Sequence, residues 1–458
     1  MKTSLNENLI DDLNASQVTE LCRGVGFFGA VMMGLGSIVG TGVFVSVAIG
    51  FSITGAWVIL AIFLASLVAI CNGLSSAQLA ANHPVSGGTY EYGHRWCSPQ
   101  IGFIAGWMFL FAKSASAAAA ALGFSGYVLL LANVSDPYWL VPLALLAVAT
   151  VTAITLIGIR RTSLVNSLIV AVTLTALAFF VIAGIPNAWA NAWSIESTVN
   201  AIAGMSHRND FSVRNLLYAT ALMFVAYTGY GRIATLGEEI DNPRRNIPRA
   251  IIVTLLVSMA LYVSVGFVVA FASQTNTEDT VEVVSKSVSL VRSAPLQTIA
   301  NGFGVPGVGV VLAVGAITAM LGVLLNLILG LSRVMLAMGR RSEMPIQAAM
   351  VSEPTRVPWV ATLIVAAIVS LIVLVGDIRI AWSFSAFAVL IYYSITNLCV
   401  LRMDRSERIY SVGPAWVGLA SCLFLAFWVP PYVWGNGLAL IAFGALWQRA
   451  AIKLQQSN

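Results

Sequence analysis

Two glycine-rich interruptions in otherwise apolar stretches are the segments of this sequence best suited to bind a polar solute. Four glycines fall between Gly34 and Gly42, and each lowers helix propensity by about 1 kcal/mol relative to alanine. A helix that unwinds here exposes amides and carbonyls that hydrocarbon cannot satisfy, so they must face a cavity or a ligand. The amides that open the second half-helix are suited to bind an anion such as a carboxylate.

The second interruption lies in residues 224–231 (FVAYTGYG). Its free carbonyls would bind an amino group. The two interruptions occupy corresponding positions five helices apart, and such pairs are typical of inverted repeats. The alternative is that the glycines only let helices pack closely, and Gly36 with Gly40 has the spacing of that motif.

Two cations, Lys113 and Arg232, fall within predicted apolar spans, whereas none of the 19 acidic residues lies well within one. A charge at the bilayer centre costs at least about 2.5 kcal/mol, so both side chains should face the protein interior. Lys113 is predicted to bind a second acidic group of a ligand or to exchange protons, and the alternative is pairing with backbone carbonyls. Arg232 could cap carbonyls of the first span, gate the cytoplasmic side or supply a fixed positive charge.

These segments belong to a chain whose composition is typical of an integral membrane protein. It has 458 residues, 59% hydrophobic and 9% charged, against about 25% charged in soluble domains. Apolar runs long enough to cross a bilayer recur throughout. They predict spans near 26–48, 55–80, 100–131, 138–158, 164–186, 214–236, 250–272, 306–334, 358–376, 380–401, 414–429 and 431–448.

The distribution of basic residues predicts the orientation of these spans. Of the 24 Lys and Arg residues, two lie within spans and five in outside loops, which leaves 17 in cytoplasmic segments. This asymmetry indicates twelve spans with both termini cytoplasmic, in the inner membrane. Basic residues in twos and threes between apolar spans argue against nucleic-acid binding. The sequence shows neither a metal-ligand set nor a nucleophile with its base at membrane depth, so we expect no enzyme and no metal site.

Three motifs resemble, in this order, those of the amino acid-polyamine-organocation permeases. They are residues 36–44 (GSIVGTGVF), 84–92 (PVSGGTYEY) and 238–251 (EEIDNPRRNIPRAI), with a weaker fourth at 332–340 (SRVMLAMGR). The resemblance implies an all-α membrane protein of twelve transmembrane helices, with a leucine-transporter-type 5+5 inverted repeat in which helices 1 and 6 are broken. The corresponding parts are a cytoplasmic tail (1–24), a first repeat (25–190), a second repeat (191–405), and helices 11 and 12 with the C-terminal tail (406–458).

The resemblance also implies a substrate site between helices 1, 3, 6 and 8. By motif position, the carboxylate would lie on the backbone of the first break, at Ser37, Ile38, Val39, Gly40, Thr41 and Gly42. The amine would lie on that of the second break, formed by Phe224, Val225, Ala226, Tyr227 and Gly229. The ring of Phe224 or Tyr227 would form a lid, although packing is the commoner role of such a ring.

The sequence departs from the family at the coupling position. Many proton-coupled members carry a lysine in span five where this chain has Thr173. Thr173 and Thr318 could coordinate Na⁺, Lys113 could couple transport to H⁺, or an exchanger would need no ion; otherwise Thr173 is an ordinary helix-packing residue. Glu238 and Glu239 open a mixed-charge loop suited to closing the inner face, or a solvated loop worth roughly 0–1 kcal/mol per ion pair.

We therefore expect a secondary active transporter, a symporter or exchanger, of small amino acids. Cationic substrates are disfavoured, because no carboxylate is predicted in the core to balance a cationic side chain. Neutral amino acids are the first expectation and acidic ones the second. A polyamine or amine permease, a transporter-like sensor and a channel are the alternatives. The expected partners are the amino acid and the lipid bilayer, with the oligomeric state open. His83, His94 and His207 are expected in loops, without a chemical role.

Overall fold

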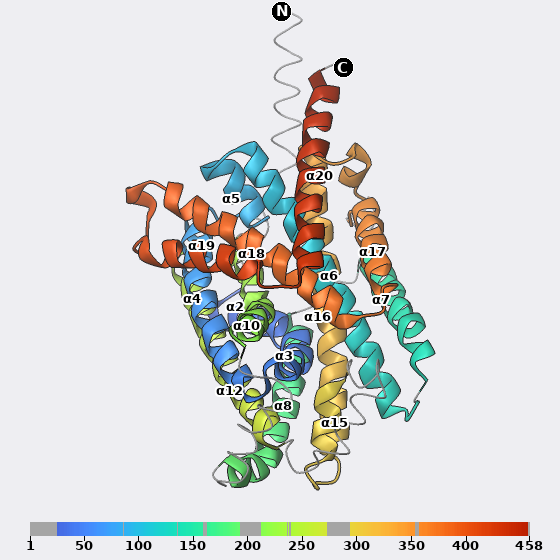
Figure 1. The fold of residues 1–458 in the computed structure, drawn as a ribbon. Helices are drawn as coiled ribbons and strands as arrows, with labels where there is room; N and C mark the ends of the chain where they lie inside the picture. The colour runs from blue at the N-terminus through green and yellow to red at the C-terminus, as the bar shows by residue number, and fades with distance from the viewer. Residues whose placement is uncertain are drawn as a thin grey trace, which may run out of the picture.

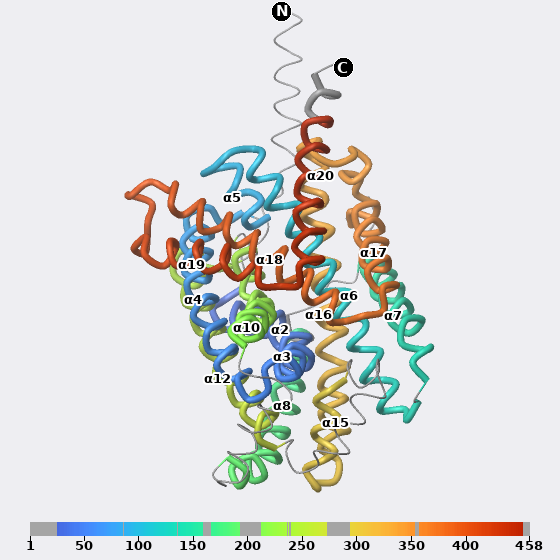
Figure 2. The backbone as a smooth tube through the Cα atoms, in the orientation of Figure 1, coloured from blue at the N-terminus to red at the C-terminus, as the bar shows by residue number. Residues whose placement is uncertain are grey.

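The computed structural model describes residues 25–456 except 86, 135, 159–162, 193–211, 236, 238–239, 273–293 and 353–356. The predicted tail 1–24 and both glutamates of the mixed-charge loop, Glu238 and Glu239, lie outside the described residues. The described part is helical apart from turns and one isolated bridge between Val25 and Ile240. Figure 1 shows the helices, and Figure 2 traces the same path as a tube.

The helices follow the predicted apolar stretches closely. In chain order they are α2 (Phe27–Ile38), the π-helix η1 (Gly42–Ser46), α3 (Val47–Thr54), η2 (Gly55–Trp57), α4 (Val58–Asn82), α5 (Thr89–Trp96), α6 (Pro99–Leu131), η3 (Pro137–Trp139), α7 (Leu140–Leu156), α8 (Ser163–Ala192), α10 (Val213–Tyr227), η4 (Thr228–Tyr230), α11 (Gly231–Thr235), α12 (Pro243–Ala272), α15 (Pro295–Asn301), α16 (Val308–Arg340), η6 (Ile346–Ala349), α17 (Trp359–Val373), α18 (Ile378–Arg402), η7 (Arg405–Glu407), α19 (Gly413–Ala426) and α20 (Pro431–Gln456).

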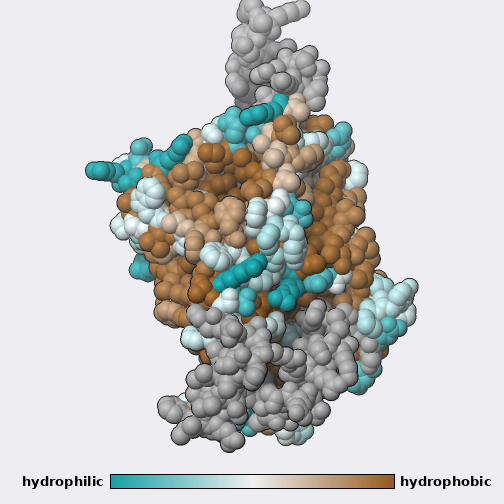
Figure 3. Space-filling view, viewed as in Figure 1, coloured by the Kyte–Doolittle hydropathy of each residue, from teal (hydrophilic) through white to brown (hydrophobic). Residues whose placement is uncertain are grey.

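Length and apolar character make this a multi-pass membrane protein. Seven helical stretches of the described chain are long and apolar enough to cross a bilayer, or eight if α19 and α20, bent by 115° at their link, count as one span. Large apolar side chains such as Phe28, Ile182 and Leu371 are exposed, as expected of a surface that faces lipid tails. Figure 3 shows this apolar surface over much of one face.

The core lies around α6, which packs against both α16 and α18. Buried alanines, Ala115 and Ala117 to Ala121, give α6 a narrow surface that lets neighbouring backbones approach closely. In the view of Figure 1, α3 and α10 are seen nearly end-on at the centre, between α4, α12, α8 and α16. The two interrupted segments are therefore enclosed by the longer helices.

Candidate functional site

The first interruption is shorter than the glycine run predicts. Helix α2 continues through Gly34 and Gly36 to Ile38, and the chain turns only at Val39 and Gly40. A Cβ added at Gly34 would lie 2.7 Å from the Ile233 side chain, so this glycine serves close packing, as the alternative interpretation holds. The helix resumes at Thr41 and passes into η1, a π-helical turn of the kind that often marks functional sites.

Backbone groups become available where the second half-helix begins. Neither Thr41 nor Gly42 donates its amide to a backbone carbonyl outside the regular helices, as expected of the first residues of a helix. The next two amides, of Val43 and Phe44, both donate to the Gly40 carbonyl, each at 3.1 Å. The first break thus presents amides, which are hydrogen-bond donors suited to a carboxylate.

The second interruption tightens rather than unwinds. Helix α10 ends at Tyr227, residues Thr228 to Tyr230 form a 3-10 turn, and α11 follows at once. The side-chain hydroxyl of Thr228 donates to the Val225 carbonyl at 2.7 Å. Tyr393 of α18 donates to the Thr228 carbonyl at 3.3 Å. The carbonyls of this break are therefore in contact with hydroxyl groups.

The two breaks meet each other. A Cβ added at Gly229 would overlap the carbonyl group of Ser37, so glycine is required for this approach. The Tyr262 hydroxyl of α12 lies 2.8 Å from the Ile38 carbonyl and 3.1 Å from the Ala226 carbonyl, and it can donate to either. One side chain thus joins the last turn of α2 to the last turn of α10. We call Ile38, Ala226, Gly229 and Tyr262 the break junction.

Lys113 contacts the second break directly. Its ammonium donates to the Thr228 hydroxyl at 2.9 Å, and its side chain is half-buried. The ion pairs of the described residues do not include it. The Lys113 ammonium therefore lies beside the turn that is expected to bind substrate, and its hydrogen-bond partner is the neutral hydroxyl of Thr228.

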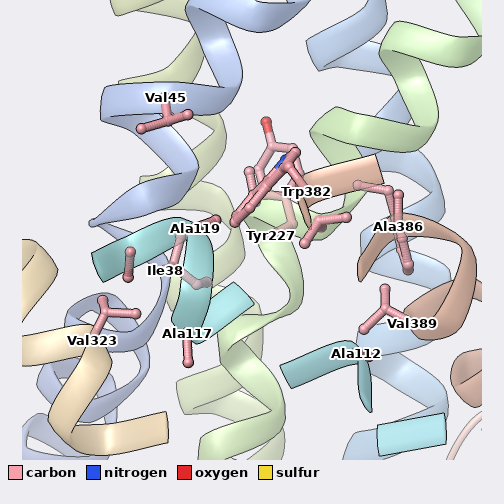
Figure 4. Close-up of a cluster of buried hydrophobic side chains, with 14 of the residues drawn as sticks. Ile38, Val45, Ala112, Ala117, Ala119, Tyr227, Val323, Trp382, Ala386 and Val389 are labelled. Carbon is pink, nitrogen blue, oxygen red and sulfur yellow. The ribbon is translucent and has the colours of Figure 1, made fainter. Parts of the chain in front are cut away.

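The two proposed lid aromatics are fully buried. Phe224 packs edge-on against Tyr393 with ring centroids 5.6 Å apart, and the Tyr227 ring lies 5.0 Å from that of Tyr262. Figure 4 draws Ile38, Tyr227 and the small side chains Ala117 and Ala119 of α6 in one buried cluster. Val225 and Ala226 are also buried. The structure thus groups the residues of the second break with the end of α2.

The proposed coupling residues lie on the surrounding helices. Thr173 is buried on α8 and donates to its own Ile169 carbonyl at 2.7 Å. Thr318 on α16 lies within 2.9 and 3.0 Å of the Val314 and Gly315 carbonyls. The Arg232 guanidinium reaches α16, where a Cβ added at Gly330 would lie 3.1 Å from it. Both threonine hydroxyls therefore use their proton within their own helix and keep oxygen lone pairs.

A polar cluster that the sequence did not reveal surrounds Glu343, just after α16. Its carboxylate accepts from Tyr90 (2.7 Å), from the His94 ring (3.1 Å) and from Gln448 of α20 (3.3 Å). His94 lies in α5 rather than in the expected loop, and its other ring nitrogen faces the Tyr90 carbonyl at 2.9 Å. We call Tyr90, His94, Glu343 and Gln448 the Glu343 cluster.

This environment favours the charged imidazolium. Each ring nitrogen of His94 faces an acceptor, so both must carry a proton to make both hydrogen bonds. Burial lowers the pKa of His94, but its hydrogen bonds to Glu343 and to the Tyr90 carbonyl raise the pKa by more, and the net pKa lies above the ordinary 6.5. The cluster therefore contains an ion pair that links α5, the end of α16 and α20.

Taken together, the interior of this chain offers backbone donors at the first break, backbone acceptors at the second, and a cation in contact with the second break. Among the described residues, no group of His, Cys, Asp and Glu is placed to hold a metal ion. The arrangement is suited to binding a small zwitterion.

Comparisons with known proteins find relatives that are transporters. The amino acid permease family matches residues 29–457. An uncharacterized transporter of Mycobacterium tuberculosis is 37% identical over 429 residues, 93% of this chain and 90% of that protein. A branched-chain amino acid permease of Bacillus subtilis is 29% identical over 77% of this chain and 75% of its own length. The human cationic amino acid transporter 4 is 27% identical over 88% of this chain and 63% of its own length. On this evidence the chain belongs to the amino acid permease family.

Proposed function

We propose that this chain is a secondary active transporter that moves a small amino acid across the inner membrane by alternating access. The observation that carries the proposal is the break junction, where two interrupted helices meet and share one tyrosine hydroxyl. The substrate carboxylate would bind the amides of Thr41 and Gly42, and its amine the carbonyls at Val225 and Ala226. Binding would then replace the contacts of Tyr262 and so couple occupancy to the packing of both helices.

The proposal includes twelve spans in a 5+5 inverted repeat with both termini cytoplasmic. Twelve result if α2 with α3, α4, α10 with α11, α17, α19 and α20 each cross, in addition to α6, α7, α8, α12, α16 and α18. The two breaks then fall in helices 1 and 6, the first of each repeat. The excess of basic residues in the segments assigned to the cytoplasm supports this orientation.

Neutral amino acids are the proposed substrates. Lys113 beside Thr228 disfavours a cationic side chain or a polyamine, because the ion pairs among the described residues leave it without a balancing carboxylate. The name of the Bacillus subtilis relative, a branched-chain amino acid permease, points the same way. Acidic substrates come second, with Lys113 as the partner of the extra carboxylate. Na⁺ at Thr173 and Thr318, H⁺ at Lys113, and ion-free exchange are the three coupling modes to test.

Counterflow in proteoliposomes tests this function. Labelled leucine, glutamate and lysine are each offered with and without Na⁺ and a pH gradient. We expect saturable counterflow of leucine, weaker counterflow of glutamate and none of lysine. Lysine as the preferred substrate would contradict the proposed class, and binding without counterflow of any amino acid would indicate a sensor.

Variants at Lys113 test the role of its charge. Lys113→Ala should lower glutamate uptake at least about tenfold, the equivalent of about 1.4 kcal/mol, and change leucine uptake little. Lys113→Arg, which keeps the charge, is the matched control and should retain most glutamate uptake. Equal loss of both substrates in Lys113→Ala would show that the lysine supports the fold of the site rather than selecting its ligand.

A further inference from the structure

A pocket distant from the break junction contains two arginines. It has a volume of about 280 Å³ and is lined by Ser52, Arg214, Asn215, Tyr218, Arg379 and Trp428, among others. These residues come from the end of α3, the first turns of α10 and α18, and the link between α19 and α20. The volume is close to the lower limit of about 300 Å³ for small-molecule sites. We call it the arginine pocket.

The charge of the pocket is not balanced by ion pairs within the described chain. Both guanidinium groups belong to exposed residues, and the ion pairs within the described part of the chain involve other cations. The nearest carboxylate in sequence, Asp377, accepts from the amides of Arg379 and Ile380 at 2.8 and 3.1 Å, so one of its oxygens already caps α18. Two arginines in one small concavity produce a positive potential that attracts anions.

The remaining groups favour a carboxylate with an organic body. Arginine forks match the two oxygens of a carboxylate, and the Asn215 amide adds a further donor. Arg379 stacks 5.9 Å above the Tyr218 ring, which fixes the guanidinium. The Tyr218 hydroxyl is already bonded to Ser383 at 2.7 Å. The apolar part of a ligand could pack on the ring of Trp428.

The same two helices connect the pocket to the break junction. Tyr218 on α10 precedes Thr228 of the second break by ten residues, which corresponds to about 15 Å along a helix axis. On the other side, Ser52 lies on α3, the helix that follows the first break. The pocket therefore lies at one end of the segments whose other ends form the proposed substrate site.

We propose that the arginine pocket is a second, peripheral binding site for carboxylate-bearing solutes, which holds acidic amino acids most tightly, neutral ones weakly and basic ones not at all. It extends the proposed function, because a solute bound here lies on the path to the break junction. In the proposed topology, this end of α3, α10 and α18 lies on the outer side of the membrane. The pocket would thereby select by charge before the solute reaches Lys113.

Modification of a thiol introduced by Ser52→Cys tests the site in the full purified chain. A negatively and a positively charged methanethiosulfonate of similar size are compared. The measured quantity is the ratio of the anionic to the cationic reaction rate. We expect this ratio to be at least about tenfold higher at the pocket thiol than for a free thiol, because two arginine charges act at short range at low ionic strength. The advantage should shrink in 1 M salt. The chain without the substitution gives the background of its own cysteines.

Substitution of the arginines completes the test. In the Ser52→Cys chain, adding Arg214→Gln with Arg379→Gln should abolish the advantage of the anionic reagent. Adding Arg214→Lys with Arg379→Lys, which keeps both charges, should preserve it. Arg405→Gln, in the distant turn η7, should not change it. Glutamate should protect the thiol better than leucine, and lysine should give no protection.

Each result bears on the pocket alone. Equal rates for the two reagents in the Ser52→Cys chain would overturn the proposal, as would protection by inorganic phosphate equal to that by glutamate, which would remove the preference for carboxylates. These rates need no transport. The pocket can therefore fail while leucine counterflow succeeds, and counterflow can fail while the pocket binds.

Discussion

The break junction and the Glu343 cluster are both polar and buried, but they differ in how completely their hydrogen bonds are made. In the cluster, both carboxylate oxygens of Glu343 have donors, and both nitrogens of His94 have acceptors. At the junction, one Tyr262 hydroxyl lies between two carbonyls and has a single proton to give. In the described structure, the buried hydroxyls of Thr41 in the first break, Ser46 in η1 and Ser114 in α6 have no hydrogen-bond partner.

This difference indicates that the break junction is the more mobile region and the Glu343 cluster the more rigid one. A fully bonded network rigidifies its surroundings, whereas partly bonded groups in a low-dielectric interior gain from a new partner. The Glu343 cluster therefore fixes α5, α16 and α20 to one another. On the proposed function, the junction is the place where a ligand changes the packing of two helices, and each of the following experiments acts on one side of this contrast.

The largest effect is expected where the two breaks touch. In Gly229→Ala, the new Cβ would overlap the Ser37 carbonyl group, which is backbone and cannot rotate away. Overpacking of this kind costs about 1–3 kcal/mol or more, and we expect uptake to fall below about a tenth of the wild-type rate. Initial rates in proteoliposomes at matched protein density, with thermal unfolding recorded in parallel, measure it.

Gly435→Ala is the matched control. A Cβ at Gly435 in α20 would have no atom within 4 Å, so uptake should be unchanged and stability equal or slightly higher. Full uptake in Gly229→Ala would show that transport does not need this close contact between the breaks. The contrast between the break junction and the Glu343 cluster would then have no bearing on transport.

A smaller effect is expected from the bridging hydroxyl. Tyr262→Phe keeps the ring contact with Tyr227 but leaves the Ile38 and Ala226 carbonyls without this donor. A buried group left unpaired costs about 1–3 kcal/mol. We expect the melting temperature to fall and the leucine KM to change several-fold, because the freed carbonyls become available to the substrate amine.

Tyr432→Phe serves as the control, because Tyr432 is 56% exposed. If Tyr262→Phe melts and transports like this control, the hydroxyl does not link the two breaks. A lower melting temperature with an unchanged KM would assign Tyr262 to stability alone.

The sequence predicted the helices and the positions of the breaks well, because both depend on residues close together in the chain. Apolar runs and glycine clusters act within one stretch of chain, and they located α2, α10 and both interruptions within a few residues. They overestimated the first break, because Gly34 and Gly36 face side chains of α12, α11 and α8, among them Thr254, Ile233 and Asn166. Tertiary packing kept that part of the run helical.

The partners of the site could not be predicted, because they come from distant parts of the chain. Tyr262 is a single hydroxyl in an apolar stretch, with no spacing to distinguish it from a packing residue. Lys113 was recognised by its burial cost, yet its contact with Thr228 joins residues 115 positions apart. The Glu343 cluster joins Tyr90 and His94 to Glu343 across 253 and 249 positions, and no single-sequence periodicity carries such information.

The smallest effect is expected in the Glu343 cluster, and it depends on pH. The pKa of His94 is raised in the folded protein, so its contribution to stability is fully present below the unfolded value near 6.5 and is lost as pH rises through the folded pKa. In His94→Gln the melting temperature should therefore fall most at about pH 6, and the difference from wild type should shrink in alkaline buffer. Thermal unfolding of both proteins between about pH 5.5 and pH 9 measures it.

A double-mutant cycle assigns this effect to the pair. Glu343→Gln and the double variant His94→Gln with Glu343→Gln complete the cycle, and the coupling should be largest at low pH, where His94 is charged. Coupling that is the same at every pH would show that the two side chains contribute by neutral hydrogen bonds. Uptake should change little in any of these variants at neutral pH. Because Glu343 also accepts from Tyr90 and Gln448, loss of the imidazolium should weaken the cluster without separating its helices. A change of similar size at the break junction is expected to alter transport itself.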